Sequence, residues 1–224
     1  MSNSLGAFNQ GSWFGVGDWD ECWIVATYWA LVAAGVMRRE DLPSIKQFRD
    51  AAGKPDRRGP TGGSIRDLLL AINTLVPEAD ARAYIGGVAG FERMLKRGYV
   101  ASLSVDSGDL PKYLQFGFKG SHQISVYAQG GKFYVMNPLA KEGSALIEIS
   151  KRDLMRAAGS LLNDGKFHAL FIRKKGDRAL AKLAEKTLPI RPRDLNAPII
   201  VRDYIDPYEA RSRYNGRRPK PFEG

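Results

Sequence analysis

Residues 18–31 read DWDECWIVATYWAL and contain Cys22, the only cysteine of the 224-residue chain. Asp18 followed three residues later by Glu21 matches a capping box, the pattern in which two side chains close the first turn of a helix. The apolar run that follows is interrupted at Gly35, a residue type common at helix C-termini. The sequence therefore predicts a buried helix with Cys22 in or just after its first turn.

The predicted position of Cys22 suggests a chemical role. The unpaired backbone N–H groups and the positive end of the dipole at a helix start favour an anion, so a thiol there loses its proton more readily than its reference pKa of about 8.5 implies. Cys22 is therefore a candidate nucleophile. The alternative is a structural residue, because cysteine outside disulfides is among the most buried residue types.

Composition limits the other functional classes. One cysteine excludes an internal disulfide and a cysteine-rich zinc site, and only two histidines are present, so we expect no metal and no cofactor. Residues 1–11 lack the charged and apolar regions of a signal peptide. The longest nearly uninterrupted apolar run, residues 23–37, is too short to span a membrane. We expect a protein made in the cytoplasm, without a signal peptide or a membrane span.

The chain carries a net charge of +10, and the excess base is concentrated at the C-terminus: residues 173–224 hold 14 Lys or Arg against seven Asp or Glu. Residues 188–224 contain six prolines and no apolar period, so they cannot form a core of their own. We predict one folded domain over residues 1–173 and an extended basic arm over residues 174–224. For this arm we favour a protein partner over nucleic acid, although its tyrosines suit protein contacts and base stacking alike.

Between the two ends, the sequence changes from helical to strand-like periodicity. Helical patterns occupy residues 38–52, 64–76 and 91–97, and strand patterns occupy residues 99–105, 122–128, 132–137, 145–149 and 167–173. Helices first and strands second indicate an α+β fold, with N-terminal helices packed on a C-terminal antiparallel sheet.

A thiolate nucleophile needs a base that holds and returns a proton, and a third group that orients the base. His122 begins a predicted strand directly after Gly120-Ser121, where its ring can face open space. His168 lies inside the apolar run FHALFI and is typical of a core or edge residue. His122 is therefore the candidate base.

The hairpin around Gly130-Gly131 predicts a partner for that base. If these glycines form a two-residue turn, Asn137 lies opposite Ile124, and the alternation of side chains puts His122 on the same face. Diagonal neighbours of this kind lie about 7–8 Å apart at the backbone, within reach of an imidazole and an amide. Asn137 would thus orient His122; alternatively, it only starts the turn before the next proline.

The order Cys, His, Asn, with a Cys-Trp at the head of a hydrophobic helix and a Gly-Ser-His strand paired with a strand ending in Asn-Pro, resembles the papain-like cysteine peptidases. Within them, the pattern is most similar to the compact bacterial and phage group related to the double-glycine leader peptidases that process bacteriocins. The Glu21-Cys22 start and the Gly62-Gly63-Ser64 segment look like that group, and the resemblance covers roughly residues 9–173.

The resemblance implies a thiol peptidase in which Cys22 attacks the scissile carbonyl, His122 acts as base and then acid, and Asn137 orients His122. The expected substrate is a peptide, from either a precursor protein or a cell-wall cross-link.

The chain departs from the family at the glutamine that stabilises the oxyanion. That residue is expected near Val16, whereas Gln10 is too distant and Asp18 is an acceptor where a donor is required. Losing one such donor typically costs about 10²–10³ in rate. The alternative function is therefore a catalytically weak or inactive papain-fold structural protein of a phage virion, in the tail, that docks through the arm of residues 174–224.

Overall fold

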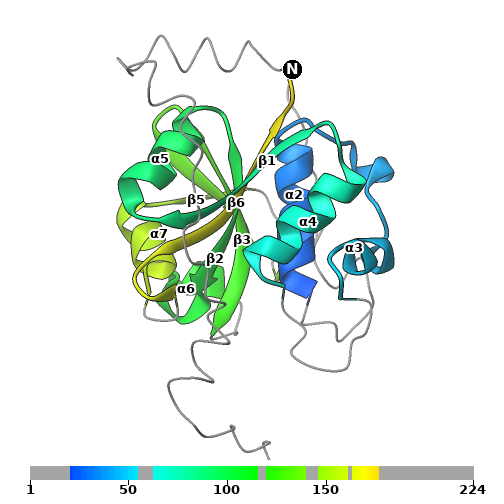
Figure 1. Ribbon diagram of the computed structural model, residues 1–224. Helices are drawn as coiled ribbons and strands as arrows, with labels where there is room; N and C mark the ends of the chain where they lie inside the picture. The colour runs from blue at the N-terminus through cyan, green and yellow to red at the C-terminus, as the bar shows by residue number, and fades with distance from the viewer. Residues whose placement is uncertain (1–20, 55–62, 116–119, 140–145, 161–162, 177–224) are drawn as a thin grey trace, which may run out of the picture.

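The computed structural model describes residues 21–54, 63–115, 120–139, 146–160 and 163–176 (Figure 1). The described part is α+β, as the sequence predicts, with six α-helices and a six-stranded antiparallel sheet. The predicted arm lies outside the described residues except for its first three positions, and the division into a domain and an arm stays a prediction.

Three helices precede the sheet, and the other three are interspersed with its strands. In chain order the elements are α2 (Cys22–Ala33), α3 (Ile45–Ala51), α4 (Ile65–Leu75), β1 (Ala79–Gly86), α5 (Val88–Lys96), β2 (Val100–Asp106), α6 (Lys112–Gln115), β3 (Ser121–Gln129), β4 (Lys132–Met136), β5 (Ile147–Ile149), α7 (Lys151–Ala158) and β6 (Phe167–Lys174), with 3-10 turns at Arg39–Asp41 and Ser107–Asp109. The strand order across the sheet is β1-β6-β2-β3-β4-β5.

The sheet lies between two layers of helices, each with its own apolar core. In Figure 1, α2, α3 and α4 cover one face, and α5, α6 and α7 cover the other. The first core joins α2, α3 and α4 to sheet residues such as Met136, Leu170 and Ile172. The second joins α5, α6 and α7 to Ile124, Phe171 and their neighbours. Successive residues of a strand therefore point into different cores.

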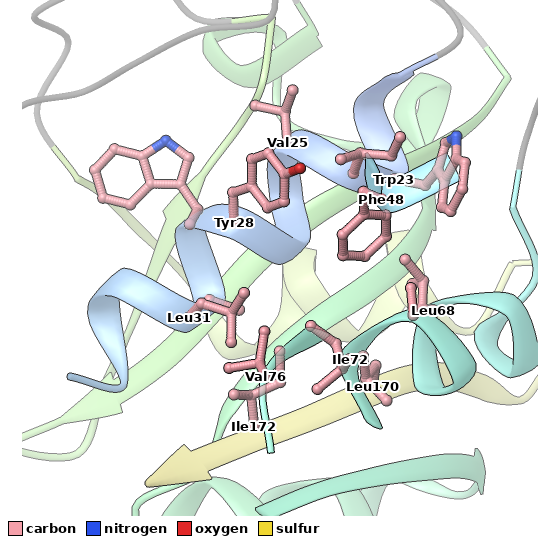
Figure 2. Packing of buried hydrophobic residues seen from close by; sticks show 14 of the residues in the cluster. Trp23, Val25, Tyr28, Leu31, Phe48, Leu68, Ile72, Val76, Leu170 and Ile172 are labelled. Carbon is pink, nitrogen blue, oxygen red and sulfur yellow. The ribbon is translucent and has the colours of Figure 1, made fainter. Parts of the chain in front are cut away.

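Helix α2 is apolar all round, and every residue from Trp23 to Leu31 is buried, which is typical of a core helix. The Trp23 ring packs edge-on against Phe48 of α3, with ring centroids 5.8 Å apart (Figure 2). Gly63 also lies against the indole, and a Cβ added there would overlap the ring. Only glycine fits this position without displacing the indole.

Two helix starts follow from local chemistry. Ser64 accepts a hydrogen bond from the Asp67 N–H and completes a capping box, so the predicted helix start at residue 64 is confirmed. The helical pattern predicted over residues 38–52 yields regular helix only from Ile45, because Pro43 disfavours helix before it and Ser44 forms its own capping box. The strand at β1 and the helices α6 and α7 were not predicted.

No helix within the described ranges is long and apolar enough to cross a membrane. In the same ranges, no group of three or more His, Cys, Asp or Glu side chains is arranged to hold a metal ion.

Candidate active site

The hairpin of β3 and β4 brings His122 and Asn137 into contact. Gln129 pairs with Lys132 and Ser125 with Met136, which is the predicted register. The imidazole Nε2 lies 2.8 Å from Asn137 Oδ1. The two side chains that the pattern placed on one face are therefore hydrogen-bonded neighbours.

The Asn137 amide is held by two further hydrogen bonds. Its Nδ2 donates to the Leu114 carbonyl of α6 at 2.7 Å, and its Oδ1 accepts from the Leu139 N–H at 2.9 Å. A carbonyl oxygen only accepts, so the nitrogen of the amide must face Leu114 and the oxygen must face His122. His122 therefore carries a proton on Nε2, and in the neutral ring Nδ1 is the basic nitrogen.

The expectation that the His122 ring faces open space is wrong, because only 3% of this residue is exposed. His122 lies on the face of the sheet that α6 covers, and Leu114 of α6 and Leu110 just before this helix belong to the core on that face. Burial lowers the pKa of His122 from 6.5 to about 4, and the hydrogen bond to Asn137 opposes part of this effect. The imidazole is thus neutral at pH 7 and able to accept a proton.

Cys22 is the first residue of α2 and is partly buried, so its predicted position at a helix start is confirmed. The capping box predicted for Asp18 and Glu21 is wrong for Glu21, and Asp18 lies outside the described residues. Glu21 is itself the N-cap residue, and its side chain makes no capping hydrogen bond. Its carboxylate lies 3.6 Å from Arg49 of α3, so a tertiary ion pair replaces the local cap.

Helix α2 and strand β3 run in the same direction. Ser125 Oγ of β3 donates to the Ala26 carbonyl, which fixes the two elements side by side. In Figure 2, α2 runs from Trp23 to Leu31 in the direction in which the arrow of β6, which carries Ile172, points. Strands β3 and β6 both pair antiparallel with β2 and so run parallel to each other. The starts of α2 and β3, which carry Cys22 and His122, therefore lie at the same end of the molecule.

Cys22 and His122 nevertheless belong to different layers. Ser125 faces α2, and the alternation along β3 directs His122 to the opposite face, together with its cross-strand partner Val105. The sheet separates the two layers along the body of α2. Any approach of the thiol to the imidazole takes place around the end of the sheet, where β3 begins.

Gln123 is a site residue that the sequence reasoning missed. It is buried, and its Nε2 donates to Ser102 Oγ at 3.1 Å. Ser102 Oγ in turn lies 3.1 Å from Thr27 Oγ1 of α2. Gln123 lies two residues before Ser125 on the same face of β3, so its side chain is on the side of the sheet that α2 covers. The recurrence of polar residues at every second position of β3 could have identified Gln123 from the sequence.

His168 lies on β6 with β2 between it and β3, and it is buried, as expected for a core residue. Burial is also the main cause of its lowered pKa. The positions discussed for the oxyanion donor, Gln10, Val16 and Asp18, lie outside the described residues. A shallow pocket near Gly35 lies at the C-terminal end of α2, away from Cys22.

Comparison with models of known protein families gives no match, and a search among curated proteins gives none either. The fold and the geometry of the site therefore carry the functional argument.

Proposed function

We propose that the chain is a papain-like thiol hydrolase that cleaves a peptide bond with Cys22 as nucleophile, His122 as base and acid, and Asn137 as the orienting residue. The observation that carries this proposal is the 2.8 Å contact between His122 Nε2 and Asn137 Oδ1, at the end of the molecule where α2 begins with Cys22. A second support is the tautomer, because the Leu114 carbonyl fixes the amide and thereby makes Nδ1 the basic nitrogen.

In the proposed reaction, Nδ1 of His122 takes the proton from the Cys22 thiol as the sulfur attacks the carbonyl carbon. A C–S bond forms, and the carbonyl electrons move to oxygen. The imidazolium then gives its proton to the leaving nitrogen as the C–N bond breaks, which leaves a thioester on Cys22 and releases an amine. Water, deprotonated by the same imidazole, hydrolyses the thioester to a carboxylic acid and restores the thiol.

Two groups stabilise charge in this scheme. Asn137 Oδ1 accepts from Nε2–H and holds the imidazolium that forms during attack. The start of α2, which carries Cys22 and the positive end of the helix dipole, favours the negative charge of the oxyanion.

The expected substrate is a peptide, either a precursor protein or a cell-wall peptide cross-link, and the arm of residues 174–224 would hold a protein partner such as another virion component. The burial of His122 and its position on the face away from α2 favour a second candidate function. In that case the chain is a papain-fold structural protein of a phage tail that docks through the arm and hydrolyses nothing.

The experiment that separates the two candidates is an unbiased cleavage assay. The full chain is incubated with a proteome-derived peptide mixture and, in parallel, with purified peptidoglycan, and new termini are identified by mass spectrometry. Products that form with the wild type and disappear in both Cys22→Ser and His122→Gln support the hydrolase. Products that persist in Cys22→Ser, or the absence of products from both substrates with a correctly folded chain, favour the structural protein. His168→Gln is the matched control, because it removes the histidine that the proposal does not use.

A further inference from the structure

A buried ion pair lies directly beside Cys22. Arg49 Nη1 of α3 is 3.6 Å from Oε1 of Glu21, the residue before the thiol, and the two side chains are only 4% and 2% exposed. The Arg49 guanidinium also lies 6.0 Å from the centre of the Trp23 ring. Arg49 thus contacts the residues on both sides of Cys22.

Stability alone does not account for this pair. Removing two charges from water costs several kcal/mol per ion, and a buried pair is often no more stable than apolar residues of the same volume. Helix α3 already packs through Phe48, which contacts Trp23 and Tyr28. The reason for the pair is therefore to be sought in its position next to Cys22 and not in its contribution to stability.

Glu21 carries its charge at the end of α2 where Cys22 lies. As the N-cap residue of α2, its carboxylate is at the end of the helix where it would compete with any anion formed at Cys22. Its side chain makes no capping hydrogen bond and is paired with Arg49 instead. Burial is the main cause of the raised pKa of Tyr28, and the Glu21 carboxylate adds to it, so its charge acts along α2 as well.

We propose that Arg49 is a positioning residue for Cys22: it holds the Glu21 carboxylate against α3 and neutralises it, so that the first turn of α2 can stabilise a negative sulfur. This inference rests on the proposed function only in assigning an anion to Cys22. It makes no use of the substrate or of the hydrolytic step.

The proposal predicts shifts of opposite sign for the two partners. Arg49→Met removes the positive charge beside the carboxylate and raises the pKa of the Cys22 thiol, whereas Glu21→Gln removes the negative charge beside the guanidinium and lowers it. For a unit charge this near the thiol, at the effective dielectric of protein interiors, we expect about one pKa unit each way, a tenfold change in thiolate fraction. The double variant should return close to the wild-type value.

The test is the rate of alkylation by iodoacetamide between pH 5 and pH 10, measured on the full chain. Cys22 is the only cysteine, so the whole signal comes from the site. Other titratable or charged groups at this end of the molecule are His122 of β3 and the pair formed by Lys54, after α3, with Asp67 of α4, and the Arg49, Glu21 and Lys46 variants keep all three. Lys46→Met is the matched control, because it breaks an exposed ion pair on the same helix α3.

Opposite shifts in the two single variants, cancelled in the double variant and absent in Lys46→Met, support the proposal. Equal shifts of the same sign in both, or no shift in either, overturn it, since a purely structural pair would disturb the thiol without regard to sign. If Arg49→Met does not fold, the downward shift in Glu21→Gln and its reversal in the double variant decide the question. A His122→Gln variant separates this inference from the proposed function: if it leaves the rate of Cys22 alkylation at neutral pH unchanged while Glu21→Gln shifts the pKa of the thiol, the proposed triad fails and the role of Arg49 stands.

Discussion

The burial of His122 predicts a specific loss of stability in acid. The folded-state pKa of about 4 lies below the ordinary value of 6.5, so the folded chain binds fewer protons than the unfolded chain between these values. The corresponding stability is fully present above pH 6.5 and is lost as the pH falls toward 4. A shift of about 2.5 units corresponds to about 3 kcal/mol, and most of this is already lost at pH 4.5.

The assay is urea unfolding of the full chain at pH 7.5 and pH 4.5, for the wild type and for His122→Gln. Carboxylates titrate in both proteins, so their effect cancels in the comparison. The wild type should lose about 2–3 kcal/mol more than the variant between the two pH values. His168→Gln should retain the loss that is due to His122. If the wild type and His122→Gln lose the same free energy of unfolding, His122 is not held neutral in a buried site, and the reasoning about its protonation is refuted.

Two further predictions concern the packing around the site. Gly63→Ala should destabilise the fold by about 1–3 kcal/mol, because the new Cβ overlaps the Trp23 ring. Gly87→Ala, where nothing lies within 4 Å, is its control in thermal unfolding, and equal melting temperatures would contradict the close contact. Asn137→Ala should cost about 1–3 kcal/mol in urea unfolding, because it leaves the buried Leu114 carbonyl without its donor. It should also slow alkylation of Cys22 at neutral pH, because His122 loses the residue that orients it. An unchanged unfolding midpoint would show that the amide is not part of a closed network.

The parts of the fold that could be predicted are those set by local pattern. The two-glycine turn at residues 130–131 fixes the register of β3 and β4, and the strand period then puts His122 and Asn137 on one face. The long apolar run after Cys22 can only be buried, which identifies α2 as a core helix. Both features are properties of short segments and need no knowledge of distant residues.

The rest depends on contacts between segments far apart in the sequence. His122 is buried on the face that α6 covers, and α6 has only four residues and no helical period of its own. Glu21 pairs with Arg49, which is 28 positions away, whereas the neighbouring residues alone predict a capping box for Glu21. Strand β1 was missed because its partner, β6, ends 88 residues after β1 itself ends. No local pattern carries information of this kind.

The most direct test of the central claim is the pH dependence of Cys22 alkylation by iodoacetamide in the wild type and in His122→Ala. If the two residues act together, the neutral imidazole takes the proton of the thiol as the sulfur attacks, so alkylation below about pH 8.5 is faster in the wild type than in His122→Ala. A slow reaction with the same unshifted pKa in both proteins would contradict the account and make Cys22 a core residue of a structural protein.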